Sequence, residues 1–195
     1  MSTIQTAAAT AARDLLRHTI ATVAYRASTA LHDAPESFAE FKPSPDGRTP
    51  AQILAHMGDL YDWVLSLCKG KQAWHDSTPL PWPQEVQRFF QSLQAVEDYL
   101  ASDQPLGCPP EKLLQGGISD SLTHIGQINM LRRTVGCPIK RETISGLISL
   151  PDASARNRVH PEKKSDIYDF AAFFDSRFFA FIRGELVLIF SASPR

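Results

Sequence analysis

The stretch TPAQILAHMGDLYDWVLSLC, residues 49–68, carries the clearest helical pattern in the chain. Thr49 can accept a hydrogen bond from an open amide of the first turn, and Pro50 fits the first helical position, where its missing N–H costs nothing. Gly70 can end the helix, because glycine adopts a left-handed backbone conformation without strain. Apolar side chains recur along one face, at Ile53, Met57, Leu60 and Val64. The sequence therefore predicts an amphipathic helix from Pro50 to about Cys68.

Three further stretches show helical periodicity, and proline- and glycine-rich segments separate the helices. The predicted helices span about residues 4–31, a stretch that begins after Pro83 and ends near Ala101, and about residues 113–135; the breaks fall at 42–48, 78–83 and 108–111. Arg132 and Arg133 suit the last helical turn, where positive charge complements the helix dipole, and we expect a solvated helix end there. Four helices with short or medium loops predict an all-α fold, an antiparallel four-helix bundle over residues 1–138.

The region 139–195 is predicted to be a C-terminal extension that packs on the bundle within the same domain. Its pattern is compatible with a helix at Asp166–Arg183 and a short strand or apolar tail at Glu185–Phe190. Phenylalanine is concentrated between Phe170 and Phe190, so this segment needs an apolar surface to cover. A lid over the bundle and a subunit contact, as in a homodimer, would both provide one.

Composition excludes several classes of protein. Of the 195 residues, 43% are hydrophobic and 21% are charged, as in an ordinary globular domain. The net charge of −1 gives no electrostatic case for binding nucleic acid, and no apolar run is long enough to span a membrane. Cys68, Cys108 and Cys137 form no CxxC pair, which favours reduced thiols and a cytoplasmic location.

Asp120 and His124 are the residues whose chemistry conflicts with the helical pattern. They follow the same repeat as core aliphatic residues, and a buried carboxylate is costly unless it is paired or bound to a cation. Side chains four residues apart on a helix lie about 5–6 Å from one another, close enough to share one metal ion. His56, on the predicted helix 50–68, is the best third ligand. Spacing alone leaves a second interpretation open, an ion pair between Asp120 and His124 on a solvated face.

Two imidazoles and one carboxylate would suit zinc, nickel or ferrous iron, with coordination positions left for water or substrate. Gln127 follows His124 by three residues and could hold a metal ligand or a bound water, or form an ordinary hydrogen bond between helices. Asp59 is expected to have a core or surface role, and His75 has no partner spacing that distinguishes it.

Two motifs resemble the DinB/YfiT-like superfamily of metal-binding helical bundles. They are TPAQILAH, residues 49–56, and DSLTHIGQI, residues 120–128, which ends in the family's H-x-G-Q-[LI] pattern. The resemblance covers roughly residues 12–138 and implies a four-helix bundle with up-down-down-up topology. It also implies that His56 and His124 bind a divalent metal. Asp120 stands where most members have histidine, which resembles the His/Glu/His sets of one branch and leaves open a site that binds no metal.

Characterised relatives in this superfamily use the metal to activate a low-molecular-weight thiol. The resemblance therefore implies a metal-dependent thiol S-transferase or hydrolase acting on a small electrophilic substrate. The alternative is a non-catalytic, stress-associated bundle that binds a metal or a ligand, and an open polar cavity over the metal would distinguish the two. An iron-dependent oxygenase is permitted by the ligand set but usually has another fold.

Overall fold

The computed structural model describes residues 3–139, with side chains from residue 7 onward, and these residues belong to the unit Met1–Ile139. All regular structure in this range is helical, which confirms the all-α prediction there. The elements are α1 (Thr3–Leu31), η1 (Glu36–Phe38), α2 (Pro50–Cys68), α3 (Trp82–Ala101), α4 (Pro110–Leu113), η2 (Leu114–Ile118) and α5 (Ser119–Thr134). The extension predicted beyond residue 139, with its helix at Asp166–Arg183 and strand at Glu185–Phe190, lies outside the described residues.

The start of α2 follows the predicted chemistry. The Thr49 side chain accepts a hydrogen bond from the Gln52 amide, and the Gln52 side chain accepts one from the Thr49 amide. This reciprocal pair is a capping box, and it satisfies two amides that the first turn leaves open. At the other end Gly70 has a φ of 72°, a conformation that favours glycine. Both predicted boundaries of this helix are confirmed.

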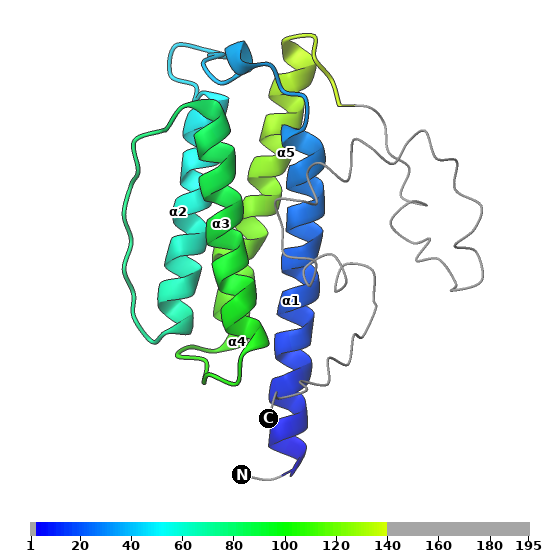
Figure 1. The fold of residues 1–195 in the computed structure, drawn as a ribbon, viewed down its shortest axis with the longest axis vertical. Helices are drawn as coiled ribbons and strands as arrows, with labels where there is room; N and C mark the ends of the chain where they lie inside the picture. The colour runs from blue at the N-terminus through cyan, green and yellow to red at the C-terminus, as the bar shows by residue number, and fades with distance from the viewer. Residues whose placement is uncertain (1–2, 140–195) are drawn as a thin grey trace, which may run out of the picture. The chain divides into compact units, whose positions relative to one another are not determined.

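The four long helices pack side by side, and α2 makes its most extensive contacts with α3 (Figure 1). Each long helix contributes aliphatic or aromatic side chains that are almost fully buried. They include Ile20, Val23 and Ala27 of α1, Leu54, Met57 and Val64 of α2, Phe89, Leu93 and Val96 of α3, and Ile125 and Ile128 of α5. The predicted apolar stripes therefore form one shared core, which holds the polar residues of α2 and α5 at fixed separations.

The connection between α2 and α3 returns along α2. Hydrogen bonds join Ala73 to Ser66 and Ser77 to Asp59, so the segment 69–81 runs antiparallel to the helix that precedes it. As a result α3 begins beside the start of α2 and runs parallel to it. The helix begins at Trp82 rather than after Pro83, because proline is accepted in a first helical turn.

Arg132 corrects the prediction of a solvated end for the last helix. Its side chain is buried and donates hydrogen bonds to the backbone carbonyls of Ala30, His32 and Cys137. These carbonyls lie in or just after the last turns of α1 and α5, where the helical backbone leaves carbonyls without a partner of its own. Arg132 therefore joins the ends of two helices, a role that its place in the sequence did not distinguish from dipole pairing.

The single helix predicted over residues 113–135 is wrong in its first part. The chain forms the short helix α4, then the π-helical turn η2, and α5 begins only at Ser119. Gly116 has non-helical backbone angles of φ −81° and ψ −116° at this break. A Cβ atom on Gly116 would lie 2.9 Å from the Trp63 ring, and one on Gly117 would lie 2.5 Å from the Val64 side chain. The two glycines therefore let the chain approach α2 closely, just before Asp120.

Candidate metal centre

The structure brings the three predicted ligands together at one place between α2 and α5. One possible ligand atom from each of His56, Asp120 and His124 lies within 4.8 Å of the other two. Asp120 Oδ2 is 3.4 Å from His124 Nε2 and 3.7 Å from His56 Nε2, and the two imidazole rings are 4.9 Å apart between centroids. The predicted combination of residues from two different helices is therefore geometrically real.

These separations suit a shared cation better than direct hydrogen bonds. A good N–H···O bond has its heavy atoms about 2.7–3.2 Å apart, shorter than either contact here. Ligand atoms that lie about 2.0–2.1 Å from a tetrahedral zinc ion are roughly 3.4 Å from one another. One contact of Asp120 equals that value and the other exceeds it by about 0.3 Å, so small side-chain rotations would complete the arrangement.

Gln127 fixes the ring of His124. Its side-chain oxygen lies 2.9 Å from His124 Nδ1, and since an amide oxygen only accepts, Nδ1 must carry the proton. In the neutral ring Nε2 is then the nitrogen with the free lone pair, and it is the atom that faces Asp120. Metal-ligating histidines commonly donate their second N–H in this way. Of the two predicted roles for Gln127, holding a ligand is the one that the geometry matches; its side chain is not used between helices.

The surroundings of His56 favour its neutral form. Burial lowers the pKa of His56 below its ordinary value, the proximity of His124 and Arg48 lowers it further, and Asp120 acts in the opposite direction. A neutral imidazole is the form that binds metals. The environment therefore leaves this histidine ready to act as a ligand at neutral pH.

The exposure of Asp120 corrects one step of the sequence argument. Its side chain is 46% exposed, against 23% for His56 and 11% for His124, and Val135 on the same predicted stripe is exposed as well. The helical repeat identifies residues that share a face, but it does not show how far the core covers that face. A half-exposed carboxylate needs no buried partner, so the case for a cation rests on the geometry of the three side chains.

Two tryptophans line the side of the centre nearest the 69–81 segment. The Trp74 ring meets the His56 ring edge-on at 5.6 Å between centroids and the Trp63 ring at 6.3 Å. Trp74 is 45% exposed, and Trp63 packs against the bare Cα of Gly116. The candidate ligands therefore have an aromatic wall on one side, and Asp120 is open to solvent.

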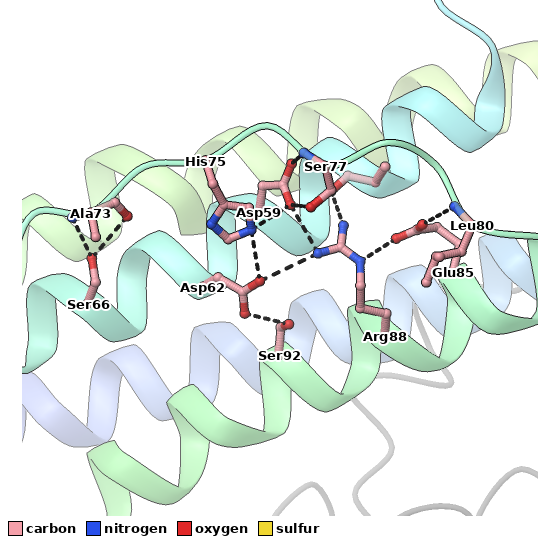
Figure 2. Close-up of polar contacts among 11 residues, drawn as sticks. Asp59, Asp62, Ser66, Ala73, His75, Ser77, Leu80, Glu85, Arg88 and Ser92 are labelled. Atoms are coloured by element: carbon pink, nitrogen blue, oxygen red, sulfur yellow. Dashed lines mark hydrogen bonds and ion pairs between the residues drawn. The ribbon is translucent and has the colours of Figure 1, made fainter.

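A second cluster of ionisable side chains holds the 69–81 segment against α2 and α3 (Figure 2). The buried Asp59 carboxylate accepts hydrogen bonds from the amide and hydroxyl of Ser77, and His75 Nε2 lies 3.1 Å from it. Arg88 donates to Asp59 and Glu85, and it also reaches the Ala55 carbonyl. The sequence did not reveal this cluster, because His75 lies in a loop and Arg88 on another helix.

Asp59, Asp62 and His75 could also hold a metal ion by their spacing. Arg88 already lies among these groups, with Nη1 3.0 Å from Asp59 and 3.5 Å from Asp62. Burial acts to lower the pKa of Arg88, but the hydrogen bonds and charges of Glu85 and Asp59 outweigh it and raise the pKa. The guanidinium therefore supplies the positive charge that a metal would supply, and His56, Asp120 and His124 are the better candidate.

Within residues 3–139, no helix is both long and apolar enough to cross a membrane. Comparison of the chain with protein-family models, with curated proteins and with solved structures finds no match. The chain's own residues and their arrangement are therefore the basis for assigning a function.

Proposed function

We propose that the protein binds a divalent metal ion, zinc or nickel in preference to iron, through His56, Asp120 and His124. The observation that carries this proposal is the approach of both histidine Nε2 atoms to Asp120 Oδ2, at 3.4 and 3.7 Å. A mixed nitrogen and oxygen set of this kind suits those borderline ions. With three protein ligands, a tetrahedral ion would keep a position for an exogenous group.

We also propose membership of the DinB/YfiT-like superfamily. The parallel course of α2 and α3, joined by the long 69–81 segment, supports the down-down step of that topology. In Figure 1 α1 and α5 run in the direction opposite to α2 and α3, which is compatible with the remaining steps. The positions of His56 and His124 on facing helices agree with the ligand positions that the motifs imply.

The reaction we propose is metal-dependent transfer of a low-molecular-weight thiol to a small electrophile, or hydrolysis of that electrophile. A divalent ion lowers the pKa of a thiol or water enough to make a nucleophile at neutral pH. The chain's own residues would orient this chemistry: Gln127 keeps His124 in the required tautomer, and Trp74 shields one side of His56. Asp120, whose side chain is 46% exposed, leaves the centre accessible to a small substrate.

The open side of the centre supports catalysis over a non-catalytic binding role. A bundle that only stores a metal gains from enclosing it, whereas a catalytic site must keep a position accessible.

Cys68, Cys108 and Cys137 are all free thiols, which supports the proposal of a reducing, cytoplasmic location.

The test is a screen of metal-loaded protein with small thiols, such as glutathione or cysteine, and the generic electrophile 1-chloro-2,4-dinitrobenzene. We expect thiol consumption that depends on added metal and falls by about 100-fold or more in His56→Ala, Asp120→Ala and His124→Ala. His32→Ala, which removes an exposed histidine remote from these ligands, should retain full activity. Activity that survives loss of the three ligands would rule out the proposed reaction.

A further inference from the structure

A cavity adjoins the candidate metal centre on the side of the α2 N-terminus. Its volume is about 410 Å³, and it is lined by Arg48, Gln52, Asp76, Ser77, Thr78 and Pro79. Pockets of this size hold small molecules. Gln52 precedes His56 by one helical turn, a rise of about 5.4 Å along the axis. A ligand in the cavity would therefore lie next to the metal ligands, within the reach of a linker of a few atoms.

One wall of this cavity is fixed before any ligand arrives. Ser77 is held by two hydrogen bonds to Asp59, at 2.8 Å from its amide and 2.7 Å from its hydroxyl. Three residues further on, the Leu80 amide donates to Glu85 at 2.8 Å. Because these bonds attach the segment to both α2 and α3, little ordering of the wall is needed when a ligand binds.

The cavity presents one positive and one negative side chain. Arg48 is the residue before the N-cap of α2, and Asp76 belongs to the 69–81 segment. In the part of the chain that the structure describes, neither is joined to another charged side chain within ion-pair distance. Gln52 of the lining and His56 are four residues apart on α2, so they lie on the same side of that helix.

We propose that this cavity binds the zwitterionic end of the substrate, an α-amino acid group, with its carboxylate on Arg48 and its ammonium on Asp76. The rest of the molecule would extend along α2 toward His56, past the exposed Trp74 ring. A ligand end that carries both charges complements both side chains, whereas a simple anion or cation complements only one of them. The inference rests on the proposed function for the reaction, but the preference for charge can be measured separately.

Three small thiols with different charges test the inference on the full-length, metal-loaded protein. L-Cysteine carries both charges, N-acetyl-L-cysteine only the carboxylate, and cysteamine only the ammonium. Calorimetry should show that wild type binds L-cysteine most tightly. Arg48→Gln should weaken L-cysteine and N-acetyl-L-cysteine by about three- to five-fold and leave cysteamine unchanged, as expected for partly exposed charge pairs. Asp76→Asn should weaken L-cysteine and cysteamine to a similar extent and leave N-acetyl-L-cysteine unchanged.

Arg133→Gln and Asp103→Asn make the same charge changes at exposed positions outside the cavity and should alter none of the three dissociation constants. Equal effects of Arg48→Gln and Asp76→Asn on all three thiols, or no effect, would overturn the inference, as would the absence of L-cysteine binding at millimolar concentration. Failure of the proposed function would give a different result. Dissociation constants that do not change when the metal is removed would contradict the metal's role, and the charge preference would still stand.

Discussion

At the scale of single residues, a hydrogen bond to one polar atom of a side chain can set the role of its other polar atom. The His124 ring illustrates this, because Gln127 binds Nδ1 and thereby sets Nε2 as the free nitrogen beside Asp120. Arg132 has three backbone carbonyls as partners and, within residues 7–139, no charged side chain at ion-pair distance, so these carbonyls account for its burial. Both residues have roles that can be measured with one substitution and one matched control.

Gln127→Ala should weaken metal binding by about 10-fold, because the His124 ring would lose the partner that fixes its tautomer and orientation. Competition with a chelator of known affinity measures the effect. Gln87→Ala, on an exposed position of α3, is the control and should bind metal as wild type does. Unchanged affinity in Gln127→Ala would show that the 2.9 Å contact does not orient a ligand.

Arg132→Met should lower the free energy of unfolding by about 2–4 kcal/mol, because it leaves the carbonyls of Ala30, His32 and Cys137 without their donor in a buried place. Chemical denaturation of the two variants Arg132→Met and Arg133→Met measures this. The neighbouring Arg133 is exposed, and its replacement should change stability by less than about 0.5 kcal/mol. Equal effects of the two substitutions would refute the structural role of Arg132.

At the scale of elements, the break before α5 positions the site. Gly116 and Gly117 let the η2 turn lie against Trp63, Val64 and the Leu60 carbonyl of α2. This close approach precedes Asp120 directly, so the separation between α2 and the start of α5 depends on two missing side chains. A larger residue at either position would push the two helices apart and with them the metal ligands.

Gly117→Ala should therefore lower the free energy of unfolding by about 1–3 kcal/mol through overpacking against α2. Gly126→Ala in α5 is the matched control, since its new Cβ atom would have nothing within 4 Å. That substitution should stabilise the protein by about 0.5–1 kcal/mol, because alanine is the better helix former. Thermal denaturation that ranks the two variants in the opposite order would contradict the packing described here.

The sequence was sufficient to predict the elements whose signals are local. The capping residues and apolar repeat of residues 49–68 contain all the information needed for α2, and both of its ends were predicted correctly. The break at Gly116 could not be predicted, because its cause is the Trp63 ring on another helix. The second cluster, with Asp59, His75 and Arg88, could not be predicted for the same reason, because its members come from three separate elements.

At the scale of the whole molecule, the long helices are joined by a few buried polar contacts as well as by the apolar core. Arg17 of α1 donates to Glu97 of α3 at 2.8 Å, and the second carboxylate oxygen of Glu97 is buried with no hydrogen-bond partner among the described residues. Burial raises the pKa of Glu97 above its ordinary value, although the contact with Arg17 acts to lower it. Stability should therefore depend on pH through this residue.

Because folding raises the pKa of Glu97, the folded state holds this proton more tightly than the unfolded state does. Its contribution to stability is present below pH 4.5 and is lost as the pH rises through the pKa of the folded state. Glu97→Gln has no such titration, so the stability of the variant relative to wild type should increase between pH 4 and pH 7. Denaturation across this range measures the difference, with the exposed substitution Glu111→Gln as the control. A relative stability that is constant or decreases with pH would show that the Arg17 contact dominates.

The sequence identifies the residues of the candidate metal centre, and the structure gives their separations. The three residues were identified from spacing and motif, and the structure places their ligand atoms within 4.8 Å of one another. The sequence predicted that Asp120 on α5 is a buried carboxylate that needs a cation. This prediction is wrong, because Asp120 is half-exposed. The geometry of its two imidazole neighbours now supports the site in place of burial, and Asp120 is the ligand on which the account depends most.

The most direct test is elemental analysis of the full-length protein, purified without a histidine tag and equilibrated with zinc and then dialysed. We predict about one divalent ion per chain in wild type and in Asp120→His, which supplies a third imidazole. We predict loss of that ion in Asp120→Ala and His124→Ala. His32→Ala serves as the control and should keep the ion. Wild-type protein that retains clearly less than one ion per chain, or alanine variants that retain as much as wild type, would contradict the assignment of His56, Asp120 and His124 as a metal centre.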